Sequence, residues 1–457
     1  MKFSVVILAA GVGSRMKSHK PKVLHRICGK SMIVRITEAA LQVSDDVHIV
    51  LYHQKEVIEA HLCEYFGDKL ESISLHTQDC QNFPGTGGAL MEPSGKLIDL
   101  AHDRLVVLNG DMPLISPESI ATIAHTQAPI VVSTITLENP SGYGRVQVDS
   151  SGQITQIIEE KDCDESQKSI TLVNAGIYGF DRELLERSLP RLSNDNAQQE
   201  YYLTDIIALN AALDSTSLLK SSAPNRIAIA PFYGNAREFM GVNSKSELAQ
   251  AESIRLQELR QRAMDQGVIM RLPESIYLEE WVEFDGECEI ENNVRICGKS
   301  VIKHSHIKAG SVVEDSVIEH SDIGPMAHIR PKSHISHTHI GNFVETKAAH
   351  LEGVKAGHLS YLGDCEIGAG SNVGAGVITC NYDGKGKHRT IIGQNVFIGS
   401  DCQLIAPVEI ESNAMIGAGS TITTNVKSGE LALSRTKQSN IAGFFHRFFA
   451  NTKERQC

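Results

Sequence analysis

The sequence lacks paired cysteines, long apolar runs and an excess of positive charge. Its ten cysteines are scattered and none forms a Cys-x-x-Cys pair, which argues against a disulfide framework or a zinc site and favours reduced thiols in the cytoplasm. No apolar run reaches about 18 residues, so we expect no membrane span. With 43 Lys and Arg against 55 Asp and Glu, neither nucleic acid nor a membrane is expected as a partner, whereas small anionic substrates remain possible.

The length of 457 residues is enough for about three domains. The first thirteen residues are apolar with one lysine and faintly resemble a signal peptide. Their apolar run is short, however, and a Gly-rich basic segment follows it at once. A buried first strand is therefore the better interpretation.

The most regular feature is a repeat near the C-terminus, where Ile398, Leu404, Ile410, Ile416 and Ile422 recur every six residues. A period of six fits neither a helix nor a half-buried strand, but it fits coils of short strands that each supply inward aliphatic residues. Glycine often follows the aliphatic residue and allows sharp turns. Earlier runs keep the step at Val317, Ile323, Ile329 and Ile335, and at Ile290, Ile296 and Ile302.

This pattern resembles the hexapeptide-repeat acyltransferases, and the resemblance implies a left-handed parallel β-helix that assembles as a homotrimer. The step is lost twice, at 342–362 and at 380–390. Insertions in a solenoid map to loops on one face, often the binding face. The second segment is long and polar, so we expect it, together with the segment around Arg435, to reach a neighbouring subunit.

The first 230 residues alternate strand and helix patterns, which predicts a doubly wound, Rossmann-like α/β domain. A helical pattern without proline covers 243–267 and predicts a long linker helix. We therefore expect a nucleotidyltransferase domain at 1–230, a linker at 231–267, a β-helix at 268–437 and a tail at 438–457. The tail is expected to form an amphipathic helix against the solenoid or to be partly disordered. The expected strands are Ser4–Ala10, Val47–Tyr52, Leu105–Leu108, Ile130–Leu137, Arg145–Val148 and Ile154–Glu159, and residues 37–43 are expected to be helical.

A Gly-rich turn directly follows the first expected strand. Gly11 and Gly13 would let backbone amides approach phosphate oxygens. Arg15 and Lys22 follow, and such cations can neutralise charge on a phosphoryl group during transfer. The segment from Leu8 to Lys22 resembles the nucleotidyltransferases that make sugar nucleotides.

Asp111 follows another expected strand, at the kind of strand end where α/β proteins bind ligands. The resemblance implies that Asp111 and Asn243 hold Mg²⁺, which needs few carboxylates because substrate phosphates supply further ligands. Asn109 stands where many members of this family have Tyr, and the spacing from Gln78 to Gly85 is stretched. The resemblance assigns further UTP and sugar contacts to Leu8, Ala9, Ala10, Gln78, Gly85, Thr86, Asn109, Gly110, Gly144, Glu159 and Asn174.

A second site is indicated by the segments around His358 and Asn381-Tyr382. A histidine suits the removal of a proton from an amine that attacks a thioester. Nearly the whole chain is similar to the bifunctional N-acetylglucosamine-1-phosphate uridylyltransferase/glucosamine-1-phosphate N-acetyltransferases. That resemblance places the phosphosugar at Arg330, Lys347, Tyr361 and Asn372, places acetyl-CoA at Ala375, Ser400, Ala418 and Arg435, and places Asn381 and Tyr382 among the residues that hold these two ligands.

The sequence thus predicts a cytoplasmic enzyme that acetylates glucosamine 1-phosphate with acetyl-CoA and then joins N-acetylglucosamine 1-phosphate to UTP, for peptidoglycan and lipopolysaccharide precursors. Glu345 is a candidate to orient His358. One alternative is a single-activity sugar-nucleotide pyrophosphorylase with a regulatory or assembly β-helix. Another is a metal-binding rod with zinc on His334 and His339.

Overall fold

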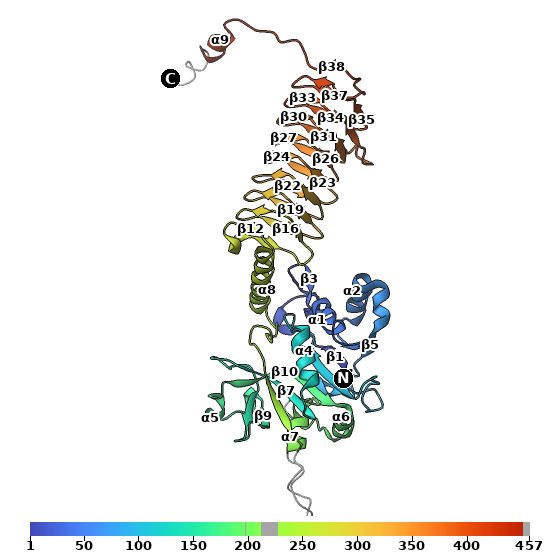
Figure 1. The fold of residues 1–457 in the computed structure, drawn as a ribbon, viewed down its shortest axis with the longest axis vertical. Coiled ribbons are helices and arrows are strands. Elements are labelled where there is room, and N and C mark those ends of the chain that lie inside the picture. The colour runs from blue at the N-terminus through green and yellow to red at the C-terminus, as the bar shows by residue number, and fades with distance from the viewer. Residues whose placement is uncertain (197, 212–226, 451–457) are drawn as a thin grey trace, which may run out of the picture. The chain divides into compact units, whose positions relative to one another are not determined.

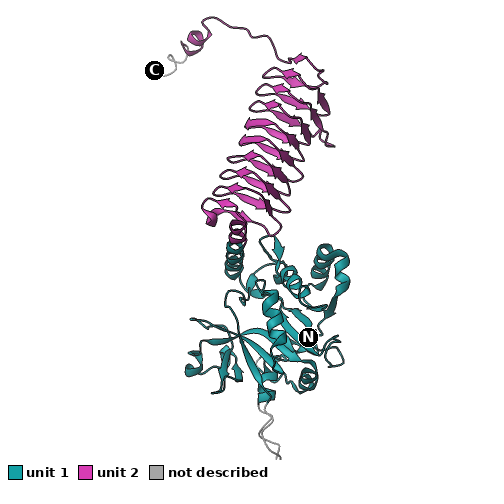
Figure 2. Cartoon of the chain, viewed as in Figure 1, with its two compact units in different colours: residues 1–258 teal, residues 259–457 magenta. Residues whose placement is uncertain are grey.

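The computed structural model describes residues 1–196, 198–211 and 227–450 and divides into two compact units (Figures 1 and 2). Unit 1 is Met1–Glu258 and unit 2 is Leu259–Cys457. The boundary falls within the long helix α8, Lys245–Asp265, so the predicted helix at 243–267 is confirmed. The functional boundaries at 230, 267 and 437 stay a prediction.

Unit 1 contains a nine-stranded sheet whose main path is β11-β7-β10-β6-β1-β4-β5. The strands β6, β1, β4 and β5 are parallel. The long strand β10 runs antiparallel between β6 and β7, a feature that the sequence pattern did not reveal. The bounds are β1 Ser4–Ala9, β4 Asp46–Leu51, β5 Ile73–Thr77, β6 Arg104–Asn109, β7 Ile130–Thr136, β8 Arg145–Val148, β9 Ile154–Ile158, β10 Leu172–Asp181 and β11 Ile229–Tyr233.

Helices pack on both faces of this sheet because its strands are apolar on both sides. Val5 and Ile7 of β1 belong to one buried cluster, which also takes in residues of α1 and α4. Val6, between them, belongs to a second cluster with residues of α6 and α7. The alternation is that of a strand with both faces covered, so the doubly wound prediction is confirmed. The helices are α1 Met32–Leu41, α2 Lys55–Phe66, α3 Gly85–Gly88, α4 Pro117–His125, α5 Glu165–Lys168, α6 Arg182–Ser188 and α7 Asp205–Ala211.

Unit 2 is the predicted left-handed parallel β-helix. Short strands from β12 (Ile269–Met270) to β38 (Leu431–Ala432) fall in turn into three parallel sheets of ten, nine and eight strands. Figure 1 shows them stacked as successive coils. Each coil buries its aliphatic side chains against the next, which makes the array a single cooperative core.

The phase of the repeat differs from the prediction in two places. Ile318 is fully buried, whereas its neighbour Val317 is only partly buried. The inward residue is therefore Ile318, one position later than the sequence pattern predicts. Residues 342–362 do not form an insertion, because Thr346 and Ala356 occupy inward positions and are fully buried. Successive inward positions are five or six residues apart there, at Ile340, Thr346, Leu351, Ala356 and Leu362, and a strict step of six misses them.

The second predicted break is confirmed as a loop between β31 (Ile378–Cys380) and β32 (Thr390–Ile392). Its backbone groups are bonded within the loop: the amide of His388 donates to the carbonyl of Asn381 at 2.8 Å, and Tyr382 pairs with Lys387. Backbone groups of the loop therefore find partners within it, and the expectation that the loop reaches a neighbouring subunit stays a prediction.

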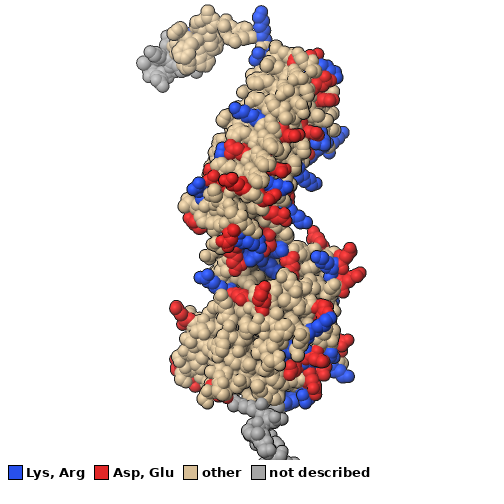
Figure 3. Space-filling model, in the orientation of Figure 1, with Lys and Arg blue, Asp and Glu red and all other residues tan. Residues whose placement is uncertain are grey.

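The tail contains helix α9, Phe444–Ala450. Its four phenylalanines are each at least 50% exposed, so the helix does not pack against the solenoid as predicted. Residues 451–457 of the predicted tail lie outside the described residues. Figure 3 shows acidic and basic side chains interspersed over the visible face of the β-helix. Within the described ranges, no helix is long and apolar enough to cross a membrane.

Candidate active sites

Several predicted residues of unit 1 follow the carboxyl ends of parallel strands. The Gly-rich turn follows β1, Gly110 and Asp111 follow β6, and Gln78 follows β5. The amide of Gly110 donates to the carbonyl of Leu8 at 2.8 Å, so the first two segments touch. A side chain on Gly110 would come within 2.9 Å of that carbonyl oxygen. Glycine therefore permits this close approach.

Three predicted residues meet directly. The Lys22 ammonium lies 2.5 Å from Oδ2 of Asp111 and 3.1 Å from Oδ1 of Asn243. Lys22 and Asp111 side chains are only 14% and 17% exposed. An amide and a carboxylate oxygen thus converge on one point that already accommodates a cation, and oxygen atoms are the ligands that Mg²⁺ prefers. The donor set fits a magnesium ion whose other ligands are substrate phosphates.

Backbone contacts position this cluster. The amide of Val242 donates to the carbonyl of Asp111 at 2.8 Å. Glu247 accepts the amide hydrogens of Asn243 and Ser244 at 2.7 and 2.8 Å, and the amide of Glu247 donates to the Ser244 hydroxyl at 3.2 Å. This reciprocal arrangement is a capping box at the start of α8. It fixes the backbone of Asn243, and the Ser-x-x-Glu pattern is a signal that sequence reasoning missed.

The Gly-rich turn lies against Lys22. Gly13 has φ 65°, and a Cβ atom there would lie 2.7 Å from Cβ of Lys22. Gly13 therefore supplies both a left-handed backbone and room for the lysine stem. Met16 is buried and anchors the turn, while Gly11 and Arg15 are exposed. Ala9 is buried and Ala10 partly buried at the strand end.

The predicted sugar-binding residues form a connected set beside this cluster. The amide of Asn174 donates to the carbonyl of Gly144 at 2.9 Å, and a Cβ on Gly144 would lie 3.6 Å from the Glu159 carboxylate. The side chain of Asn109 donates to the carbonyl of Gly176 at 3.1 Å. Asn109 thus supports the bulge of β10 that follows Asn174. It makes this structural contact at the position where many family members have Tyr.

The electrostatics of this set raise the pKa of one carboxyl. Desolvation by the surrounding protein, then Asp162 and Asp205, raise the pKa of Glu159, although the residue is exposed at the surface. Burial, then Glu247 and Asp111, also raise the pKa of Tyr143, which is half-buried. Tyr143 was not predicted as a site residue and lies within electrostatic reach of Asp111.

Gln78, Gly85 and Thr86 form a further group. The Gln78 side chain donates to the carbonyls of Phe83 and Gly85 at 3.0 and 2.9 Å, so it closes the stretched loop on itself. The Thr86 hydroxyl accepts the amide of Leu203 at 3.1 Å. Gly85 has φ 92° and lies against Tyr201. These contacts explain how the longer loop is held, and they occupy both amide hydrogens of Gln78.

In unit 2, four predicted residues form one column. Four strands of one sheet have aligned inward residues: β27 (Lys355–His358), β30 (Asn372–Val373), β33 (Phe397–Ile398) and β36 (Met415–Ile416). Two residues beyond these inward positions lie, in the same order, His358, Ala375, Ser400 and Ala418. Neighbouring coils lie about 4.8 Å apart, so the column runs for roughly 14 Å. Arg435 joins it by donating to the carbonyl of Ala418 at 2.8 Å. Asn372 precedes the inward Val373 in β30.

Glycines allow successive coils to approach each other closely along this column. A Cβ on Gly374 would lie 2.6 Å from the backbone of Gly399 and Ser400, and one on Gly399 would lie 2.4 Å from the amide nitrogen of Ala418. Successive coils therefore approach each other at this corner as only glycine allows. The result is a column of backbone and small side chains with His358 at one end.

A cluster of cations lies on a second sheet. Arg330 of β22 (His328–Arg330) and Lys347 of β25 (Glu345–Lys347) are register partners. Lys387 of the 380–390 loop, and then Arg330, lower the pKa of Lys347. Lys387 was not predicted, because nothing local in the sequence indicates that this loop returns to Lys347. Three neighbouring cations favour the binding of an anion such as phosphate.

Asp364 connects this cluster to the loop. Its carboxylate accepts a hydrogen bond from the Asn381 side chain at 2.5 Å, and its carbonyl accepts the amide of Thr390 at 3.2 Å. The Tyr361 hydroxyl lies 3.4 Å from the same Asn381 nitrogen. Asp364 therefore holds both ends of the loop, while Tyr382 within the loop is 62% exposed. Asp364 was also missed by sequence reasoning.

Two expectations for unit 2 are wrong. Glu345 does not orient His358: its carboxylate accepts a hydrogen bond from Arg330 at 2.8 Å. His334 and His339 lie on different sheets, in β23 (His334–Ser336) and β24 (His339–Asn342). His334 stacks on His350 and His339 bonds to Asp322. Across the residues that the structure describes, no group of three or more His, Cys, Asp or Glu could hold a metal ion.

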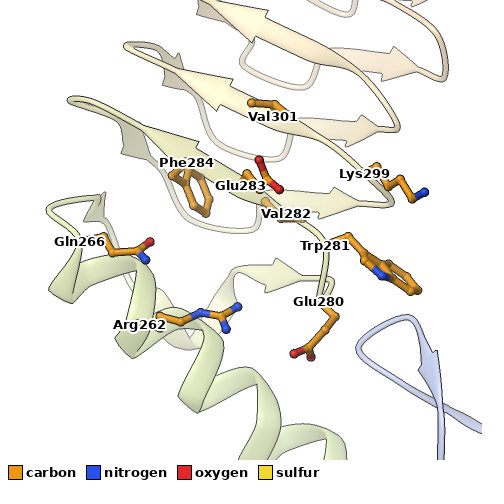
Figure 4. A pocket seen from close by; sticks show the side chains of 9 residues that line it. All are labelled: Arg262, Gln266, Glu280, Trp281, Val282, Glu283, Phe284, Lys299 and Val301. Carbon is orange, nitrogen blue, oxygen red and sulfur yellow. The ribbon is translucent and has the colours of Figure 1, made fainter. Parts of the chain in front are cut away.

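A hollow near the start of the β-helix involves none of the predicted residues (Figure 4). Arg262 of α8 faces it together with Phe284 of β14 (Glu283–Asp285) and Val301 of β17 (Val301–Lys303). Its charged side chains are of both signs. None of its lining residues belongs to the residues described above for either candidate site.

Comparison with known proteins agrees with this division. Residues 5–154 match the MobA-like NTP transferase domain, and residues 389–424 match the bacterial transferase hexapeptide repeat. The chain is 53% identical to the Bifunctional protein GlmU of Wolinella succinogenes, covering 99% of this chain and 100% of the relative. It is 54% identical to that of Helicobacter hepaticus, covering 99% of both. It is 51% identical to that of Helicobacter pylori, covering 98% of this chain and 99% of the relative.

Proposed function

Because the chain belongs to the GlmU family of bifunctional proteins, we propose that its two reactions take place at the two groups of residues described above. The protein is a transferase that acetylates glucosamine 1-phosphate from acetyl-CoA and then transfers a uridylyl group from UTP to N-acetylglucosamine 1-phosphate. Pyrophosphate leaves in the second reaction, and the product feeds cell-wall precursors.

Uridylyl transfer is assigned to unit 1. The observation that carries it is the convergence of Lys22, Asp111 and Asn243 beside the Gly-rich turn. Amides of the turn, Arg15 and Lys22 hold the triphosphate while a phosphate oxygen of the sugar attacks the α-phosphorus. Asp111 and Asn243 hold Mg²⁺, which supplies neutralisation of phosphate charge when bound. Gly144, Glu159 and Asn174 position the sugar.

Acetyl transfer is assigned to unit 2. The extended arm of acetyl-CoA lies along the column of small residues above His358, and Arg330, Lys347 and Lys387 bind the phosphate of glucosamine 1-phosphate. The amine attacks the thioester carbonyl, His358 accepts the proton of the amine, and the thiolate of coenzyme A leaves. This assignment is supported by the shared column of His358, Ala375, Ser400 and Ala418.

We further assign the enzyme to the cytoplasm and to a homotrimer. Phe397, Met415 and Leu431 are register partners on one sheet of the β-helix and are each exposed by 46–55%. Such an apolar stripe suits subunit packing. If neighbouring subunits share a site, co-refolding inactive His358→Ala with inactive Arg435→Ala restores acetyl transfer. A mixture as inactive as its parts would place both residues of each site in one chain.

The assignment is tested by measuring both half-reactions on one preparation. We expect acetyl transfer to glucosamine 1-phosphate and pyrophosphate release from UTP with N-acetylglucosamine 1-phosphate. A preparation with pyrophosphate release alone would support the alternative of a single-activity pyrophosphorylase whose β-helix serves assembly or regulation. Addition of a chelator tests magnesium: it should abolish pyrophosphate release and leave acetyl transfer unchanged.

A further inference from the structure

The three residues that meet in unit 1 suggest a role for Lys22 beyond phosphate binding. We propose that the Lys22 ammonium competes with the metal ion for the oxygens of Asp111 and Asn243, and leaves them when UTP arrives. The enzyme then loads its metal together with the nucleotide. This inference rests on the proposed uridylyl transfer and on Asp111 and Asn243 as the metal-binding pair.

The geometry permits only one cation between the two oxygens. Lys22 Nζ lies 2.5 Å from Asp111 and 3.1 Å from Asn243, and a metal ion binds such oxygens at about 2.0–2.1 Å. The ammonium and the metal would repel each other strongly in this partly buried setting. Metal binding to these oxygens therefore requires that the ammonium move.

The contacts show which partner can move. Asp111 is tied by its backbone to Val242, and the backbone of Asn243 is fixed by Glu247. The backbone of Lys22 is anchored, because Val23 and Leu24 are buried and Gly13 lies against its Cβ, whereas its ammonium contacts the side-chain oxygens of Asp111 and Asn243. Its four-carbon stem can redirect the charge without moving the backbone.

The direction of movement follows from the same contacts. The Gly-rich turn that lies against the Lys22 stem is the proposed cradle of the triphosphate. An incoming phosphate group offers the ammonium a second anionic partner within reach, and this releases Asp111 and Asn243. Metal and nucleotide should then strengthen each other's binding, and by linkage each does so by the same factor.

The experiment uses the full-length protein and Mn²⁺ as a paramagnetic probe, with free ion measured by electron paramagnetic resonance. Wild type is compared with Lys22→Met, without nucleotide and with a UTP analogue carrying an α,β-imido bridge, after correction for Mn²⁺ held by free analogue. We expect Lys22→Met to bind Mn²⁺ about tenfold more tightly than wild type without nucleotide, since loss of an ion pair at this distance corresponds to at least one power of ten. The analogue should tighten Mn²⁺ binding less in the variant.

Lys20→Met is the matched control, because it removes a charge from the same segment. Lys20 is bonded to neither Asp111 nor Asn243 in the described part of the chain, so Mn²⁺ affinity should stay at the wild-type value. Equal tightening in both variants would reduce the effect to general charge and overturn the proposal, as would unchanged affinity in Lys22→Met. A separate variant, Asp111→Asn, tests the pair itself: if Mn²⁺ binding is unaffected there, the proposed metal site is wrong whatever Lys22 does.

Discussion

The two candidate sites are built in different ways. In unit 1, Lys22, Asp111 and Asn243 are far apart in the chain and meet because parallel strands end at one edge of a sheet. In unit 2, His358 and the alanines of its column meet because successive coils are in register. Residues at the same distance from the inward position of each coil therefore lie above one another. The first site therefore depends on the packing of a whole domain. The second depends on register, and a single inserted residue would disrupt its column.

The largest expected effect separates the two sites. Asp111→Asn removes the charge proposed to hold Mg²⁺, and uridylyl transfer should fall by about 10³-fold, roughly 4 kcal/mol of transition-state stabilisation. Acetyl transfer, measured on the same sample, should be unchanged. A parallel loss of both rates in a folded protein would show that the sites are not independent.

His358→Ala is the reciprocal change. Loss of the proposed general base should reduce the rate of acetyl transfer by about 10²- to 10⁴-fold, while pyrophosphate release stays normal. His350→Ala is the matched control, because His350 is an exposed histidine on another sheet of the same β-helix. A near-normal rate for His358→Ala would exclude this histidine as the base.

Asp364 tests whether the loop contributes to the second site. Asp364→Ala removes the hydrogen-bond acceptor for Asn381. KM for glucosamine 1-phosphate should then rise about tenfold, with a smaller change in kcat, because the loss of one hydrogen bond weakens binding of the substrate in its ground state. Asp364→Asn keeps an oxygen acceptor and should recover most of the loss. Equal defects in both variants would instead point to the charge on Asp364.

The smallest effect concerns pH. Because the pKa of Glu159 is raised, the side chain should take up a proton at a higher pH than an ordinary glutamate, whose pKa is about 4.3. KM for N-acetylglucosamine 1-phosphate should then rise a few-fold as pH falls through that window, and Glu159→Gln should flatten this limb. The folded state binds this proton more tightly than the unfolded state, so this group's contribution to stability falls as pH rises through the window. The Gln variant should accordingly be no less stable than wild type at neutral pH.

The two units also differ in what their sequence could reveal. The six-residue period predicted the β-helix because each coil must bury aliphatic side chains. It missed the coils at 342–362, where the inward Thr346 is accommodated by a hydrogen bond between its hydroxyl and that of Ser333 at 3.2 Å. In unit 1 the strand pattern predicted the α/β class. The antiparallel position of β10 depends on tertiary pairing that no local pattern encodes.

The site residues follow the same division. Gly13, Lys22 and Asp111 lie in motifs that a sequence displays, and the structure brings Lys22 and Asp111 into contact. Lys387 and Asp364 lie in no recognisable motif. Their contacts join different coils and the 380–390 loop, so they depend on how the coils are stacked. Glu247 had a readable capping pattern, but its link to Asn243 emerges only from the hydrogen bonds.

The central claim is that each unit carries one complete type of chemistry, and a fragment ending at residue 265 tests it most directly. This fragment keeps all of α8, and with it the Glu247 cap of Asn243 and the bond from the Cys28 amide to Glu252. Assayed for both reactions beside the full chain, it should retain pyrophosphate release within a few-fold and show no acetyl transfer. A folded fragment without pyrophosphate release would contradict the claim.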